Sequence, residues 1–122
     1  MSNSNDRISQ HYGSAGLPDR ILSALKQAGK NTNSLTVEDL APLDQFHTRG
    51  LAATRELITF AGVKPGWRVL DVGSGLGGPA RVLASEKNCH VTGVDITKEF
   101  CDVATMLSKL TRLEHVTDFR HG

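Results

Sequence analysis

The sequence contains few of the residues that build disulfide frameworks or metal sites. It has two cysteines in 122 residues, Cys89 and Cys101, which are too few and too far apart for either purpose. Its five histidines are scattered and show no metal-binding spacing. We therefore predict no metal site and expect both cysteines to be reduced thiols, as is usual in a cytoplasmic protein.

An excess of one charge and long apolar runs are also missing. The chain has 14 basic and 13 acidic residues, so it has no general attraction to nucleic acid or to a charged membrane surface. No apolar segment is long enough to span a bilayer, and the polar N-terminus lacks the apolar region of a signal peptide. The sequence therefore predicts neither nucleic acid nor membrane as a partner, and its length allows one domain at most.

What is present is one glycine-rich stretch, residues 68–81. A short apolar run, interrupted only by Asp71, leads into four closely spaced glycines, and Pro79 then begins a predicted helix. A strand, a glycine loop and a helix N-terminus in this order are typical of a nucleotide-type cofactor site, in which backbone N–H groups and the helix dipole point at the ligand. Glycine also allows positive φ and close approach of a ligand to the main chain. The predicted contacts are Gly73, Ser74, Gly75, Gly77 and Gly78.

A second predicted strand, residues 90–95, ends in a carboxylate. Asp95 lies 22 residues after Gly73, close to the spacing at which an acidic residue binds the ribose of a nucleotide. Because parallel strands bring their carboxyl ends to one edge of a sheet, we expect Asp95 to lie beside the glycine loop.

Asp71 indicates which nucleotide fits. Gly73, Gly75 and Gly78 also satisfy the dinucleotide fingerprint, but a carboxylate two residues before the loop would repel a pyrophosphate. S-adenosylmethionine (SAM) brings a positive sulfonium and ammonium instead, and two unit charges at about 4 Å attract by roughly 4 kcal/mol at an effective dielectric near 20. The charge therefore favours SAM, and a half-domain of an NAD-dependent oxidoreductase is the disfavoured alternative.

Residues 69–78 (VLDVGSGLGG) and 91–97 (VTGVDIT) resemble the first two SAM-binding motifs of class I methyltransferases. Residues 43–55 (LDQFHTRGLAATR) resemble the lead-in of small-molecule methyltransferases related to the sarcosine/dimethylglycine, phosphoethanolamine and ubiquinone-type enzymes. The resemblance covers residues 17–122 and implies SAM as cofactor and a small-molecule methyl acceptor. It further implies that Gln45 and His47 lie over the methionine end of SAM, with a polar residue at the helix start as the alternative for His47. Ile96 lies against the adenine on this reading, with burial in the core as the alternative.

The chain divides into three predicted parts: a flexible arm (1–16), a helical lead-in (17–62) and a partial SAM-binding Rossmann-like domain (63–122). Helices are expected at 18–28, 49–61, 79–86 and 97–109, and the last of these has a predicted buried stripe that includes Phe100. A further short helix is expected to begin at a capping box formed by Thr36 and Asp39. A third strand is expected at 116–120. The fold class is α/β, a parallel sheet with only the first three strands of a class I methyltransferase and with N-terminal helices.

The methyltransferases that the sequence resembles have seven strands, and this chain ends at Gly122 after the third. We therefore expect an N-terminal cofactor-binding fragment whose exposed sheet edge self-associates or accepts a complementary C-terminal half. No residue is a convincing general base, so the catalytic residues are unknown and carbon, nitrogen and oxygen acceptors all stay open. A non-catalytic module that binds SAM or a partner chain is the alternative to a methyltransferase.

Overall fold

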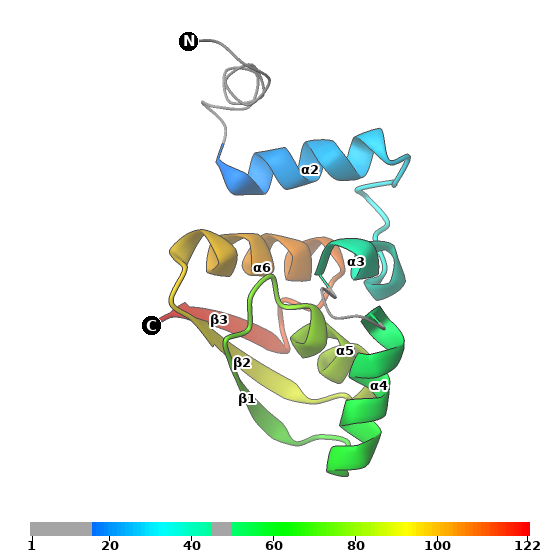
Figure 1. Cartoon of the computed structure of the whole chain (residues 1–122), viewed down its shortest axis with the longest axis vertical. Coiled ribbons are helices and arrows are strands. Elements are labelled where there is room, and N and C mark those ends of the chain that lie inside the picture. The colour runs from blue at the N-terminus through cyan, green and yellow to red at the C-terminus, as the bar shows by residue number, and fades with distance from the viewer. Residues whose placement is uncertain (1–15, 45–49) are drawn as a thin grey trace.

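The computed structural model describes residues 16–44 and 50–122, and its strands and helices alternate as expected (Figure 1). The predicted arm therefore lies outside the described residues, except for Gly16. The observed elements are α2 (Leu17–Gln27), α3 (Val37–Asp44), α4 (Gly50–Ala61), β1 (Arg68–Val72), α5 (Gly78–Lys87), β2 (His90–Asp95), α6 (Lys98–Leu110) and β3 (Thr117–His121).

The sheet is parallel, in the order β1-β2-β3, which confirms the predicted topology. Val72 lies opposite Val94, and Asp95 lies opposite His121, so the carboxyl ends of neighbouring strands are aligned. The segments that follow β1 and β2 consequently meet at one edge of the sheet, as the sequence predicted.

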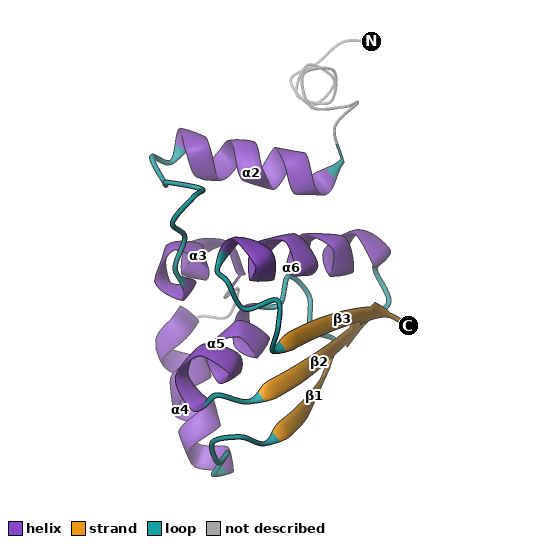
Figure 2. Ribbon diagram, turned by 180° about the vertical axis from the view of Figure 1, so that it is seen from behind, coloured by secondary structure: helices purple, strands orange, loops and turns teal. Residues whose placement is uncertain are grey.

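Helices α5 and α6 pack on the sheet, α4 packs beside α5, and α2 packs on the outer side of α6 (Figures 1 and 2). Side chains alternate between the two faces along a strand. Leu70 and Val72 of β1 are 64% and 77% exposed, so among the described residues no element covers them. Within the same residues, no helix has the length and apolarity needed to cross a bilayer.

Two apolar clusters form the core, one between α2, α3 and α6 and one between α5 and the sheet. Leu40 and Leu107 are fully buried in the first, and Val82 and Cys89 in the second. Cys89 and Cys101 are free thiols, as predicted, and both are buried. The prediction that Phe100 is buried is wrong: this residue lies in the first turn of α6 and its side chain is 38% exposed.

The capping box before α3 is confirmed. The Thr36 N–H donates to Asp39 Oδ2 at 3.0 Å, and the Asp39 N–H donates to Thr36 Oγ1 at 3.2 Å. These reciprocal bonds satisfy two backbone donors that a helix start leaves without helical partners. They also lower the pKa of Asp39, because hydrogen bonds from Thr36 stabilise its ionised form.

Candidate cofactor site

The glycine loop after β1 requires glycine at three positions with positive φ: Gly73 at 73°, Gly75 at 56° and Gly77 at 85°. A Cβ atom added at Gly73 or Gly75 would meet no other atom within 4 Å, so the main chain there faces open space. A Cβ at Gly77 would instead lie 2.7 Å from the Phe119 ring. The loop is thus open on one side and packed from beneath on the other.

The amides of this loop are largely used by the protein itself. Four of them donate within the chain: Gly73 N–H to Val94 O (2.7 Å), Ser74 N–H to Val94 O (3.1 Å), Gly75 N–H to Asp95 Oδ2 (2.9 Å) and Gly77 N–H to Ser74 O (2.9 Å). The prediction that the loop's N–H groups point at a ligand is therefore wrong for these four amides. The physical reason is that three of these donors are satisfied at the end of β2, and the fourth, that of Gly77, is satisfied within the loop itself.

The start of α5 is also poorly suited to a phosphate. Pro79 lacks an N–H group, and Gly78 and Ala80 on either side of it are buried. An anion site at a helix N-terminus depends on accessible N–H donors. The loop therefore presents an open backbone surface without the amide cradle that a pyrophosphate needs, which agrees with the inference drawn from Asp71.

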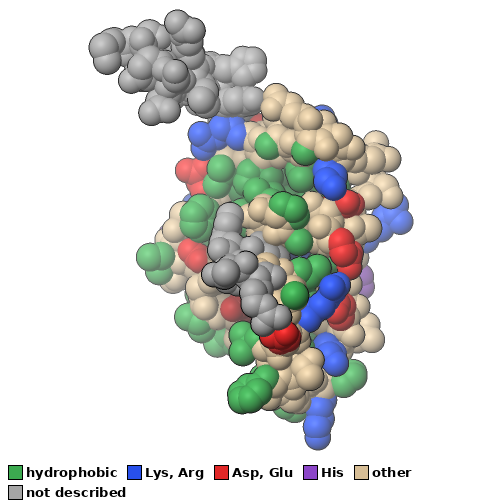
Figure 3. All heavy atoms as spheres, turned by 45° about the vertical axis from the view of Figure 1, so that its right-hand side comes forward, with side chains coloured by type: hydrophobic (Ala, Val, Ile, Leu, Met, Phe, Trp, Pro, Cys, Tyr) green, Lys and Arg blue, Asp and Glu red, His purple; other side chains and the backbone are tan. Residues whose placement is uncertain are grey.

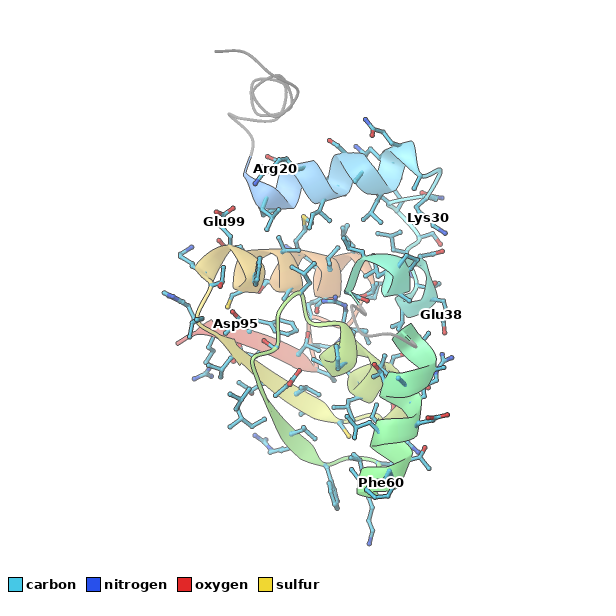
Figure 4. The ribbon with its side chains drawn as sticks, in the orientation of Figure 1. Arg20, Lys30, Glu38, Phe60, Asp95 and Glu99 are labelled. Carbon is cyan, nitrogen blue, oxygen red and sulfur yellow. The ribbon has the colours of Figure 1, made fainter. Side chains whose placement is uncertain are left out.

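Asp95 lies at the end of β2 and holds the loop in place (Figure 4). Its Oδ1 accepts the Thr97 N–H and its Oδ2 accepts the Gly75 N–H, both at 2.9 Å. These bonds, that of Thr97 first, lower the pKa of Asp95 and keep it ionised. Because a carboxylate oxygen can accept more than one hydrogen bond, Asp95 retains acceptor capacity for ribose hydroxyls.

Asp71 is half-buried on β1, and its Oδ2 is buried without a hydrogen-bond partner among the described residues. Burial raises the pKa of Asp71, and the negative charge of Asp95 raises it further. A buried carboxylate without a partner is unfavourable, and a nearby cation would stabilise its ionised form. The residues present therefore fit a positively charged ligand group.

Other predicted contacts are placed differently. Ser74 is buried, and its Oγ would lie 2.7 Å from a Cβ on Gly93, so its side chain faces the sheet beneath the loop. Ile96 is 84% exposed beside Asp95, so the alternative of core burial for Ile96 is wrong in this structure. Gln45 and His47 lie outside the described residues.

Sequence reasoning missed two residues beneath the loop, Arg81 and Phe119. A Cβ on Gly77 would contact both side chains, and a Cβ on Gly93 would lie 2.6 Å from the Phe119 ring. The sequence carried one signal for Arg81, a charged residue between the apolar residues of α5. Nothing in the sequence pattern indicated Phe119, because its position under the loop depends on the strand register.

An apolar groove of about 570 Å³ runs between α4, β1 and α5, with Asp71 among its lining residues. Leu57 and Ile58 line it from α4 and Leu70 lines it from β1. Leu57 is 66% exposed, so part of the apolar face of α4 reaches the surface. Figure 3 views the α4 side of the molecule, where hydrophobic side chains reach the surface among charged ones. The described residues contain no cluster of three or more histidine, cysteine or acidic side chains that could hold a metal.

Comparison with protein families shows that residues 70–122 match the family model described as a methyltransferase domain. The chain is 54% identical over 37 residues to the sterol 24-C-methyltransferase ERG6B of Gibberella zeae, covering 30% of this chain and 10% of that protein. It is 42% identical over 50 residues to phosphoethanolamine N-methyltransferase 1 of Arabidopsis thaliana, covering 41% of this chain and 10% of the relative. The matched segments therefore span about a tenth of each of these relatives.

Solved structures show the same similarity. A SAM-dependent methyltransferase from Geobacter sulfurreducens, in complex with S-adenosyl-L-homocysteine, aligns with a TM-score of 0.58 and 26% identity, covering 70% of this chain and 34% of that one. Phosphoethanolamine N-methyltransferase 2 of Haemonchus contortus, in complex with SAM, gives a TM-score of 0.54 and 29% identity, covering 63% and 18%. The predicted Rossmann-like fold and the resemblance to class I methyltransferases are both confirmed.

Proposed function

We propose that this chain, whose residues 70–122 match a methyltransferase-domain model, is the cofactor-binding part of a SAM-dependent enzyme that methylates a small molecule. The observation that carries the proposal is the pairing of an open glycine loop with two carboxylates of different character. Asp95 is held ionised by backbone N–H groups, and Asp71 has a buried oxygen without a partner. The first suits a ribose and the second suits a cation.

SAM supplies an electrophilic methyl group on a sulfonium that is itself a good leaving group. The task of this chain's residues is then to orient the cofactor, because holding the reacting atoms in line accounts for much of the rate enhancement of a transfer reaction. In this proposal Asp95 fixes the ribose, and the open backbone at Gly73 and Gly75 lets the nucleoside lie directly on the main chain. Asp71 balances the positive end of the cofactor, and Ile96 offers an exposed apolar surface to the adenine.

The small-molecule acceptor is supported by the relatives, whose names include sterol and phosphoethanolamine methyltransferases. Within the proposal, Ser74, Gly77 and Gly78 contribute loop backbone to the cofactor site, and Gln45 and His47 cover the methionine end. The acceptor atom, whether carbon, nitrogen or oxygen, stays open.

We also propose that the three parts of the chain, 1–16, 17–62 and 63–122, act as an arm, a helical lead-in and a cofactor domain. The second edge of β1 and the adjoining apolar groove would then receive another copy of this chain or a complementary C-terminal half. A cytoplasmic location is part of this proposal and is supported by the free thiols of Cys89 and Cys101.

The decisive experiment is calorimetry with SAM, S-adenosylhomocysteine and NAD. We expect both SAM and S-adenosylhomocysteine to bind more tightly than NAD, and Asp71→Asn to weaken SAM binding. Asp102→Asn is the matched control, because Asp102 is an exposed acid on α6 whose partner, Lys98 at 3.1 Å, is also exposed. Tighter binding of NAD would refute the proposal and favour the oxidoreductase alternative. Binding of SAM without methyl transfer, even when a complementary half is supplied, would favour a non-catalytic module.

A further inference from the structure

Arg81 lies in the first turns of α5, directly beneath the glycine loop, and its side chain is 1% exposed. We propose that Arg81 is a positioning residue for the cofactor, and that its guanidinium locks the glycine loop in the shape that receives the nucleoside. The inference rests on the proposed function and adds a residue that makes no contact with the ligand itself.

The guanidinium joins three segments of the chain that are distant in sequence. One nitrogen, Nη2, donates to Leu76 O in the loop at 2.6 Å and to Asp44 Oδ2 at the end of α3 at 2.7 Å. The other, Nη1, donates to the carbonyl of Ala104 at 3.1 Å and to Ser108 Oγ at 3.3 Å, both on α6. The planar fork of arginine can serve several acceptors at once, which the single ammonium of lysine cannot do in the same geometry.

The bond to Leu76 O acts at the centre of the loop. The Gly75 amide on one side donates to Asp95, and the Gly77 position on the other side lies so close to Arg81 that an added Cβ would be 2.8 Å from Nη1. Glycine has the greatest backbone freedom of all residues, so a loop with two flanking glycines needs an external constraint to keep one shape. Arg81 supplies this constraint from beneath and leaves the open surface to the cofactor.

The main alternative is that Arg81 and Asp44 only stabilise the fold. A buried ion pair is weak support for that role, because well-packed apolar replacements of both partners are often neutral or stabilising. The hydrogen bond to Leu76 O supports a role in the loop, because its acceptor is a main-chain oxygen of the glycine loop itself. A residue that only joined helices would not need this bond. The two roles predict different behaviour of the loop in a variant that still folds.

The test compares the double variant Asp44→Leu/Arg81→Met with the single control Ser108→Ala. The control removes one Arg81 bond to α6 and leaves the bond to Leu76 O in place. In the double variant we expect hydrogen exchange of the Gly75 and Gly77 amides to rise and S-adenosylhomocysteine binding to weaken, each about tenfold, as expected for losing one charge-assisted bond. The Val91 amide of β2, which donates at 2.9 Å to the carbonyl of Val116 just before β3, should exchange as before.

The variant Arg81→Lys gives a second, independent reading and decides the matter if the double variant does not fold. Lysine keeps the positive charge that pairs with Asp44 but lacks the forked guanidinium. If the loop needs the fork, its amides should still exchange faster in Arg81→Lys than in the original chain. Unchanged loop exchange in a folded double variant, or full restoration of loop protection by lysine, would overturn the inference. Failure of the unaltered chain to bind S-adenosylhomocysteine would instead count against the proposed function, and loop exchange would still test Arg81.

Discussion

Asp71 on β1 and Asp95 on β2 lie close enough for the charge of Asp95 to act on Asp71. Burial is the main cause that raises the pKa of Asp71, and the negative charge of Asp95 adds to it. The site therefore holds one acid, Asp71, whose ionisation is disfavoured by burial and by a neighbouring negative charge, and a cationic ligand would relieve this. The negative charge of Asp71 therefore destabilises the fold without ligand and would stabilise the proposed complex with SAM.

The first prediction is that Asp71→Asn stabilises the ligand-free chain while weakening SAM binding. The amide removes a buried charge without changing the side-chain shape, so the melting temperature at neutral pH should rise by a few degrees. SAM affinity should fall about tenfold, which corresponds to about 1.4 kcal/mol. Thermal melts and calorimetry measure the two effects, with Asp102→Asn as the exposed control. A lower melting temperature for Asp71→Asn would show that Asp71 supports the fold.

The second prediction concerns pH. Because the folded pKa of Asp71 is raised above its ordinary value of 3.8, its protonated form is favoured in the fold. Its contribution to stability is therefore greatest below pH 3.8 and is lost as the pH rises through the raised pKa. SAM affinity should show the opposite trend, falling as the pH drops through that same pKa. Calorimetry over a pH series tests this, and the trend should be absent in Asp71→Asn.

The third prediction is a loss of nucleoside affinity in Asp95→Ala. A carboxylate that accepts two ribose hydroxyls makes two charge-assisted bonds, each worth about 1.5–3 kcal/mol. Each lost bond should weaken binding roughly ten- to a hundredfold. The structure adds a second effect, because the same carboxylate holds the amides of Gly75 and Thr97. Asp95→Asn, which keeps one acceptor oxygen, should bind better than Asp95→Ala, and equal affinity for the alanine variant and the original chain would exclude the ribose role.

The sequence predicted the order of strands and helices and the meeting of Asp71, Asp95 and the glycine loop, because short local patterns encode these features. It did not predict that the loop amides are satisfied within the protein, since two of their acceptors, Val94 O and Asp95 Oδ2, come from another strand. The roles of Arg81 and Phe119 were missed for the same reason. The exposure of Phe100 was missed because helical periodicity identifies the apolar face of a helix, but not which part of that face packs against a neighbouring element.

The fourth prediction separates two glycines of the loop. Gly77→Ala should destabilise the fold by about 2–4 kcal/mol, because its left-handed φ costs about 1–2 kcal/mol and its Cβ would also overlap the Phe119 ring. Gly73→Ala has the same backbone cost but no overlap, so it should be about 1–2 kcal/mol destabilised. Denaturant unfolding of both variants measures the difference. Equal losses would show that Phe119 and Arg81 move aside at little cost.

The last prediction is that the 122-residue chain associates through β1. Among the described residues β1 pairs only with β2, and an unpaired strand edge is a template for another chain. Leu70 and Val72 add exposed apolar surface at 64% and 77%. A domain of this size is stable by only about 5–15 kcal/mol, so association that covers this surface should stabilise it measurably. Because association depends on concentration, the melting temperature should rise as the protein concentration rises.

Light scattering over a concentration series should therefore show species larger than the monomer, and Val72→Lys should shift the chain toward monomer. Ile96→Lys is the control, because it introduces the same charge at another exposed apolar residue, 84% exposed, that lies beyond the end of β2 and off the β1 edge. Lysine on an edge strand opposes pairing because its charge cannot be buried in a joined sheet. A sharp, concentration-independent melt from a strictly monomeric sample would show that β1 needs no partner, and that the groove beside it is open surface in the working protein.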